Sequence, residues 1–181
     1  MRFCCVIKRY LQGLFLLQLL TFGVVFGFSQ DIRTLKANFI QKTLSQENTL
    51  EYSGTLLAKV PAKAKWAYEK PTKKEIYING KKTIIYEPFL EQVSMGSTKR
   101  KIDFLQILRE AKLQKDGKYH SVFEDIDYAL TLQGKIPKKL EFIDEFENAV
   151  EILFENVRIN ENIDEREFNF VIPPNVDIIR Q

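Results

Sequence analysis

Residues Glu51–Gln92, EYSGTLLAKVPAKAKWAYEKPTKKEIYINGKKTIIYEPFLEQ, decide how this chain folds. Apolar or small side chains occupy every second position along much of this stretch, which indicates strands with one sheltered and one solvated face. Pro61 and Pro71 separate the strands, because proline cannot donate a hydrogen bond to a central ladder. The sheltered positions are Tyr52, Gly54, Leu56, Ala58, Val60, Ala64, Trp66 and Tyr68.

Glycines punctuate the same stretch in two ways. Gly54 lies inside a strand, where a glycine weakens pairing, and it therefore predicts a bend or a close approach of two backbones. Asn79-Gly80 separates two apolar runs and predicts a type I′ hairpin with both residues at its centre.

Strand patterns resume after Asp116-Gly117. They predict roughly ten or eleven short strands in all, joined locally as in an antiparallel meander. The last of them is expected at Arg166–Ile172, where Pro173-Pro174 stops it. The later strand segments read KYHSVF, DYALTLQ, KKLEFI, NAVEILFENVRI and REFNFVI.

Two helices are expected. Ile102–Ala111 has a polar strip of Asp103, Gln106 and Glu110 and is apolar elsewhere, so this helix requires burial on most sides. Asp31–Lys36 is expected to form a short first helix. The predicted fold is mainly β (α+β): a single curved antiparallel sheet, an incomplete barrel, with short helices against its concave side.

The first thirty residues are typical of a secretory signal peptide, with a basic start, an apolar run and small residues at Gly27 and Ser29. We expect cleavage after Ser29, which leaves 30–181 as one domain; a retained membrane anchor is the alternative. Cys4 and Cys5 both lie in the removed segment, so the exported chain would have neither a disulfide nor a thiolate metal site.

Charge is distributed unevenly along the exported chain. Asp31–His120 has 18 basic and 10 acidic residues, whereas Ser121–Gln181 has 6 and 14. This asymmetry indicates either a docking face or two halves of one sheet with complementary solvated surfaces.

Catalytic groups are sparse. His120 could form a hydrolase triad with Ser121 or Ser94, but neither serine has the glycines of a nucleophile elbow. The acidic runs 124–127 and 144–147 lack the glycine and oxygen spacing of a calcium loop. We therefore expect no enzyme, no metal and no cofactor. The lysine-rich turns, with Trp66, Tyr77 and Tyr86 nearby, are interpreted as solvated surface rather than a nucleic-acid site, because an exported protein rarely meets nucleic acid. A surface for an acidic partner protein or for anionic lipid head groups is the alternative.

The order of motifs resembles the outer-membrane lipoprotein carrier family, the periplasmic LolA proteins. The matching motifs are Phe39-Ile40-Gln41-Lys42, Ser53-Gly54-Thr55-Leu56, Lys59-Val60-Pro61, Lys65-Trp66-Ala67-Tyr68 with Pro71, Tyr86-Glu87-Pro88-Phe89-Leu90-Glu91-Gln92, and Phe168-Asn169-Phe170 with Pro173-Pro174 as the last strand.

This resemblance implies an apolar cavity under the helices that holds acyl chains. It also implies a monomer in the periplasm that receives acylated lipoproteins from an inner-membrane ABC-type transporter and passes them to an outer-membrane lipoprotein receptor. The alternating strands and the apolar helix supply the residues that we expect on the acyl-chain wall and its helical cover: Leu56, Ala58, Val60, Ala64, Trp66, Tyr68, Phe104, Leu105, Ile107 and Leu108.

Two positions depart from the family pattern. Val60 replaces an arginine thought to hold the helical lid closed, and Ala64 replaces a bulky aromatic residue; Lys59 or Lys63 is the candidate substitute for the arginine. Two other functions stay open from the residues alone: a small exported hydrolase that uses His120, and a β-domain that binds an envelope protein without lipid.

Overall fold

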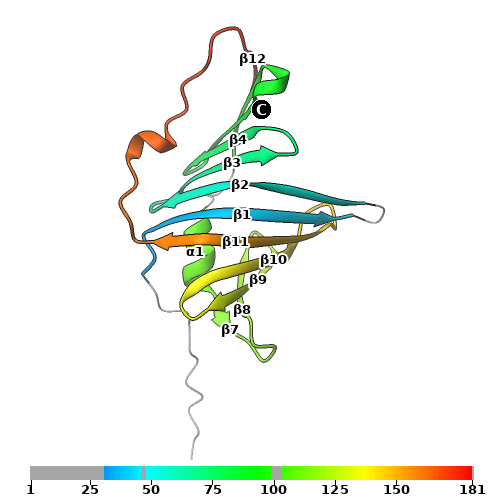
Figure 1. The fold of residues 1–181 in the computed structure, drawn as a ribbon, viewed down its shortest axis with the longest axis vertical. Helices are drawn as coiled ribbons and strands as arrows, with labels where there is room; N and C mark the ends of the chain where they lie inside the picture. Colours follow the sequence, from blue (N-terminus) through cyan, green and yellow to red (C-terminus); the bar gives the residue numbers. More distant parts are fainter. Residues whose placement is uncertain (1–30, 46–47, 99–102, 181) are drawn as a thin grey trace, which may run out of the picture.

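A computed structural model describes residues 31–45, 48–98 and 103–180 of the 181-residue chain. Twelve strands form one curved sheet, with a single α-helix, α1, on its inner side among the described residues (Figure 1). The strands are β1 (Thr34–Leu44), β2 (Thr49–Lys59), β3 (Lys63–Lys70), β4 (Lys74–Asn79), β5 (Lys82–Glu87), β6 (Gln92–Ser97), β7 (Lys112–Leu113), β8 (Tyr119–Phe123), β9 (Ile126–Gln133), β10 (Ile136–Ile143), β11 (Ala149–Ile159) and β12 (Asp177–Arg180).

The sheet does not close on itself. Its strand order is β12-β6-β5-β4-β3-β2-β1-β11-β10-β9-β8-β7, so β12 and β7 lie at opposite edges. Every pairing is antiparallel except that of β12 with β6, which is parallel. The prediction of a mainly β protein with one curved, incomplete barrel is therefore confirmed, with one parallel edge that the sequence pattern does not reveal.

The strand phase predicted from Glu51–Gln92 is the phase observed. Leu56, Ala58 and Ala64 are buried, and cross-strand pairs Leu56↔Trp66 and Ala58↔Ala64 place them on one face. Across β1, Ala37 pairs with Leu56 and Phe39 with Gly54, so both belong to the same face. This concave face carries the hydrophobic core.

Gly54 is a close backbone approach, as predicted. A Cβ at this position would lie 2.0 Å from the carbonyl oxygen of Ala67, and the β2–β3 register shifts between Ser53 and Gly54. The β4–β5 hairpin is also present, but its register differs from the prediction by one residue. Asn79 pairs with Lys82, so the loop is Gly80-Lys81, and Gly80 adopts a φ of 64°.

The apolar helix is α1 (Phe104–Glu110), within the predicted Ile102–Ala111; Ile102 lies outside the described residues. Asp103 begins it by accepting a hydrogen bond from the backbone N of Gln106 at 3.1 Å. Phe104, Leu105, Ile107 and Leu108 are all buried, which confirms that the helix packs on most sides.

The expected first helix at Asp31–Lys36 is wrong. β1 begins at Thr34 and pairs with both β2 and β11 along this region. Ile32 and Leu35, whose three-residue spacing favours a helix, are both fully buried. The alternation Leu35, Ala37, Phe39 continues into the strand, and two neighbouring strands outweigh the weak helical signal of six residues.

The expected final strand at Arg166–Ile172 is also wrong. Asp164 accepts a hydrogen bond from the backbone N of Arg166 at 2.9 Å and begins the 3₁₀ helix η2 (Glu165–Phe168). Phe168 is buried, and the Phe170 ring packs on Tyr77 and Tyr86 with centroids 5.2 and 5.5 Å away. The last strand, β12, follows the two prolines instead of preceding them. A second 3₁₀ helix, η1 (Pro88–Leu90), joins β5 to β6.

The C-terminal segment between β11 and β12 runs along one end of the strands to reach β6 (Figure 1). The predicted signal peptide, Met1–Ser29, lies outside the described residues and stays a prediction, as does the single domain at 30–181. Within the described residues, α1 and the 3₁₀ turns are too short to cross a bilayer, and no membrane-spanning helix is found.

Candidate functional site

Aromatic rings join the concave face of the sheet to α1. Phe39 on β1 packs edge-to-face against Trp66 and Tyr68, with ring centroids 5.1 and 5.0 Å away. Trp66 in turn contacts Phe104 of α1 at 5.5 Å, and Phe104 contacts Phe154 of β11 at 6.0 Å. These edge-to-face pairs link three strands to the helix through favourable ring geometry.

The structure brings nine of the ten predicted wall and cover residues into one apolar cluster. Leu56, Ala58, Ala64, Phe104, Leu105 and Leu108 are buried in it, and Val60, Trp66 and Tyr68 are partly buried against it. Ile107 is buried but does not belong to that cluster. α1 itself covers the predicted wall, and its Phe104 ring contacts Trp66 and Phe154 of the sheet.

Several strands of the concave face contribute residues that the site predicted from the sequence does not include. The alternation in β9, β10 and β11 indicates strands, but nothing in it shows that these strands face α1 together with β2 and β3. Pairing of β1 with β11 brings them there. The missed residues of the cluster include Phe39, Ile78, Leu130, Leu140, Val150, Ile152 and Phe154.

Tyr68 lies at the edge of the apolar cluster, where polar contacts begin. Its hydroxyl donates to the Gln41 side-chain oxygen at 3.0 Å, and the Lys74 ammonium lies 4.7 Å from its ring centroid. Burial, with the neighbouring Tyr52, raises the pKa of Tyr68 to about 12. The phenol therefore stays neutral at any physiological pH, and the face keeps its apolar character up to this residue.

Arg109 fastens α1 to the start of the fold. Its guanidinium donates to the backbone oxygen of Ile32 at 3.2 Å and lies 3.4 Å from the Asp103 carboxylate. The Asp103 side chain thus serves both the helix N-terminus and this arginine. These few polar contacts hold a helix whose remaining contacts are apolar and non-directional.

Lys59 and Lys63 do not take over the role of the missing lid arginine. Both ammonium groups bind the Glu165 carboxylate, and Lys59 also donates to the backbone oxygen of Ile163 at 2.9 Å. Hydrogen bonds from Lys59 and then Lys63 hold the pKa of Glu165 below its usual value. The expectation that one of them substitutes for the arginine at position 60 therefore has no support here, because these lysines fasten the C-terminal segment and not α1.

His120 is not placed for nucleophilic catalysis. Its Nε2 lies 3.0 Å from Asp116 and its Nδ1 lies 3.0 Å from Asp127, and the hydrogen bond with Asp116 raises its pKa. Because each ring nitrogen faces a carboxylate, neither is directed at a serine hydroxyl. Ser121 projects from the opposite side of β8, and Ser94 lies on β6, many strands away.

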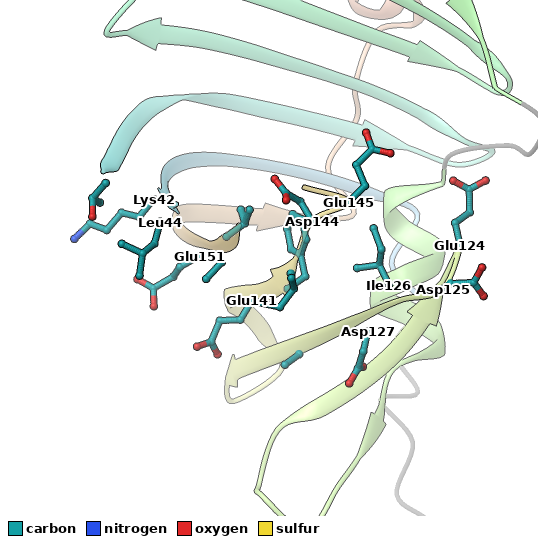
Figure 2. A pocket seen from close by; sticks show the side chains of 16 residues that line it. Lys42, Leu44, Glu124, Asp125, Ile126, Asp127, Glu141, Asp144, Glu145 and Glu151 are labelled. Atoms are coloured by element: carbon teal, nitrogen blue, oxygen red, sulfur yellow. The ribbon is translucent and has the colours of Figure 1, made fainter. Parts of the chain in front are cut away.

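A groove of about 1040 Å³ lies at the end of the sheet where the β8–β9 turn and the β10–β11 hairpin meet, and none of the ten predicted residues lines it. Much of its lining lies on the face opposite the apolar cluster, but Phe142 and Val150 of that cluster also line it. Carboxylates of the β10–β11 hairpin and of the β8–β9 turn surround it, with Ile126 between them (Figure 2). We call this the outer groove, defined by Leu44, Asp127, Ala129, Glu141, Ile143 and Ala149 together with the two turns. Within the described residues, no group of three or more histidine, cysteine or acidic side chains is arranged to hold a metal ion.

Known proteins match this chain over most of its length. The outer-membrane lipoprotein carrier protein of Helicobacter hepaticus is 36% identical over 157 residues, which cover 86% of this chain and 88% of that protein. Its counterpart in Helicobacter pylori strain HPAG1 is 42% identical over 84% of this chain and 83% of that protein. A crystal structure of an uncharacterized conserved protein from Thermus thermophilus matches with a TM-score of 0.52 at 13% identity, over 82% of this chain and 91% of that chain, and shows the fold alone.

The family profile described as "Outer membrane lipoprotein carrier protein LolA" matches residues 30–125. These names describe carriers, which confirms the expectation of a protein that is not an enzyme. The ring cluster, the open sheet and the profile match thus agree, and the chain belongs to the LolA family of outer-membrane lipoprotein carrier proteins.

Proposed function

We propose that the chain is an exported periplasmic carrier that shields the acyl chains of lipoproteins released from the inner membrane and delivers them to an outer-membrane receptor. The observation that carries the proposal is the apolar concave face covered by one short helix. The names of the relatives, which describe lipoprotein carriers, support the nature of the cargo.

An acyl chain in water requires such a cover. Its exposure costs roughly 0.8 kcal/mol per methylene, so a chain of about fourteen methylenes costs on the order of 11 kcal/mol. A carrier has to offset most of this cost while it holds the cargo, yet it must also release the cargo without a chemical energy source. A wall that matches the acyl chain only moderately satisfies both requirements.

We assign α1 as the element that the cargo displaces. The six sheet residues Leu56, Ala58, Val60, Ala64, Trp66 and Tyr68 form the wall, and Phe104, Leu105, Ile107 and Leu108 form the cover that occupies it when no cargo is bound. When an acyl chain replaces these side chains, apolar contacts are exchanged for apolar contacts. The exchange is therefore nearly balanced in free energy, and loading and release both stay accessible.

The remaining parts of the proposal follow the family resemblance. The carrier works as a monomer in the periplasm after removal of residues 1–29, takes cargo from an ABC-type lipoprotein-releasing transporter and meets a receptor lipoprotein at the outer membrane. It uses no cofactor or metal and binds no nucleic acid.

Trp66 offers an internal reporter of acyl binding, because it is the only tryptophan in the chain. It contacts both Phe39 and Phe104. Titration of the exported chain with a triacylated lipopeptide is expected to change Trp66 emission saturably as α1 leaves the ring. A titration without any change, together with no lipid in the purified protein, would contradict the carrier function and favour a lipid-free binding domain.

Two variants should move the affinity in opposite directions. Phe104→Ala weakens the cover and is expected to tighten lipopeptide binding severalfold, whereas Leu56→Ala removes part of the wall and should weaken it. Both variants destabilise the fold, so a nonspecific effect would move both affinities the same way. Val122→Ala is the control that leaves binding unchanged, because Val122 is 68% exposed and lies on the face of β8 opposite the buried Ser121.

A further inference from the structure

The outer groove has an apolar floor on the face of the sheet opposite α1. Leu44 pairs with Ala149 across β1 and β11, and Ala149 pairs with Ile143 across β11 and β10, so their side chains form one row. Leu44 is 54% exposed and Ile143 56% exposed. Because alternate residues of these strands face the core, this row points away from the ring cluster. It is an apolar strip of the sheet that nothing in the described chain covers.

A second row runs beside the first. Lys42 pairs with Glu151, and Glu151 pairs with Glu141, two residues along each strand from the apolar row. The chain largely neutralises this row itself, because Lys139 lies 3.0 Å from Glu141 and 3.2 Å from Glu151. Because two residues along a strand span about 7 Å, the apolar row and the charged row are about 7 Å apart. Strand register fixes which row is apolar and which is charged.

The turns above the floor carry carboxylates that the chain does not neutralise. Glu124 and Asp125 in the β8–β9 turn and Glu145 in the β10–β11 turn line the groove, are exposed, and have no ion-pair partner among the described residues. Figure 2 shows them around the opening, on both sides of Ile126. The same turn as Glu145 also presents Phe146, whose side chain is 76% exposed.

We propose that the outer groove is a docking site for a basic amphipathic segment of a partner protein. Its aliphatic side chains lie on the row of Leu44, Ala149 and Ile143, and its lysines or arginines meet Glu124, Asp125 and Glu145. Charge complementarity identifies this occupant: the free groups at the opening are all carboxylates, which repel acidic peptides and anionic lipid surfaces. Exposed aliphatic side chains in a groove, in turn, favour a partner with its own apolar side chains.

The site is distinct from the proposed acyl-chain wall, because none of the ten wall and cover residues lines the groove and its row of Leu44, Ala149 and Ile143 faces away from the core. Phe142 and Val150 line the groove and also belong to the apolar cluster. A partner bound here would leave α1 free to move. The inference therefore does not rest on the proposed function, and a protein that binds no lipid could still dock a partner in this way.

The test uses a synthetic 14-residue helical peptide with leucine on one face and flanking lysines, added to the ¹⁵N-labelled exported chain. We expect saturable shifts of amide signals centred on the ends of β1 and β10, the start of β11 and the two turns. Binding should weaken strongly between about 50 and 300 mM salt, as exposed charge pairs do. Shifts centred on α1, or none that saturate, would overturn the proposal.

Paired variants distinguish binding in this groove from nonspecific attraction of the basic peptide to acidic side chains. Glu124→Gln with Glu145→Gln is expected to weaken peptide binding about three- to tenfold, a range typical of two exposed ion pairs. Glu69→Gln with Glu155→Gln removes the same charge from exposed positions outside the groove and should leave the affinity unchanged. Equal losses in both pairs would mean nonspecific attraction and would reject the site.

The apolar floor and the identity of the occupant are tested separately. Ile143→Ser should weaken the peptide severalfold, whereas Val171→Ser, at a position 81% exposed and outside the groove, should not. Sedimentation of the chain without peptide is expected to show a monomer at both salt concentrations. A dimer that Ile143→Ser dissociates would overturn the proposal, because the occupant would then be a second copy.

Discussion

Asp125 and Glu124 form the two central residues of the β8–β9 turn with φ of 66° and 50°. This left-handed conformation disfavours ordinary side chains and suits glycine or asparagine. No local signal predicts it, since an acidic pair between two strands resembles any solvated turn. Two of the free carboxylates of the outer groove are thus held by a strained backbone.

Asp125→Gly is expected to stabilise the protein by about 0.5–1 kcal/mol, because glycine removes the strain at positive φ. Unfolding in urea, followed by circular dichroism, measures the change. Asp125→Asn tests the effect of charge while it keeps a side chain that tolerates this conformation. If Asp125→Gly were less stable than the unmodified chain, the strain would be absent.

His120 should make stability depend on pH. Its hydrogen bonds to Asp116 and Asp127 raise its folded-state pKa above the ordinary value of 6.5. The stabilisation is therefore complete below about pH 6.5 and is lost as the pH rises through the raised pKa. The melting temperature of the unmodified chain, minus that of His120→Gln, is expected to fall as the pH rises above about 6.5.

Asp116 should make stability depend on pH in the opposite direction, at acidic pH. Its hydrogen bond with His120 lowers its pKa below 3.8, so its contribution is present above that pH and disappears as the pH falls through the lowered pKa. If the difference in melting temperature between the unmodified chain and His120→Gln did not change with pH, the contacts of His120 with Asp116 and Asp127 would not form in solution.

At the scale of single elements, the close approach at Gly54 joins β2 to β3. Gly54→Ala is expected to destabilise the protein by about 2–4 kcal/mol, since the added methyl would meet backbone atoms that cannot move aside cheaply. Gly96 on β6 is the matched control: a Cβ there meets nothing within 4 Å, so Gly96→Ala should be neutral. Similar chemical denaturation midpoints for the two variants would contradict this account.

The N-cap of α1 links helix stability to the proposed cargo exchange. Asp103→Ala removes the hydrogen bond to Gln106 and the contact with Arg109, and should lower the free energy of unfolding by about 0.5–2 kcal/mol. If α1 is the displaced cover, the same variant should bind the triacylated lipopeptide more tightly. Lower stability with unchanged lipopeptide affinity would argue against displacement of α1.

Local chemistry explains which elements were predictable. Pro61, Gly54 and the alternation around Trp66 predict where the strands end and which side chains are buried, because both depend on residues within this segment. The predictions of secondary structure fail where residues distant in the sequence determine the local conformation. Leu35 joins a strand because β11 and β2 flank it, and Phe168 turns into η2 because Asp164 caps that turn. The outer groove depends on pairing between β1, β10 and β11, which no local pattern specifies.

At the scale of the whole molecule, the structure shows where the acidic half of the sequence lies. The acidic half of the chain, Ser121–Gln181, contributes the turns around the outer groove. The sequence alone leaves a docking face and two complementary surfaces as alternatives. The free carboxylates of Glu124, Asp125 and Glu145 favour the docking face.

Stability should vary from the centre of the sheet to its edges. β1 has two long neighbours, β2 and β11, whereas β7 contains two residues and β12 four at the open edges. Amide hydrogen exchange is expected to be slowest in β1 and β11 and fastest in β7, β12 and α1. Protection in α1 equal to that of β1 would mean that the helix opens only when the whole protein unfolds, which would contradict its assignment as a displaced cover.

The pairing of β1 with β11 also sets the order in which the chain can fold. β1 through β6 are joined by short connections and can pair as they emerge, but Leu35 meets Ile159 only after nearly all of the chain has been made. Until then one side of β1 is an unpaired edge, the kind of edge that recruits other chains. If the chain is exported as proposed, its central strand stays incomplete until the last strands emerge, which suits translocation of an unfolded polypeptide.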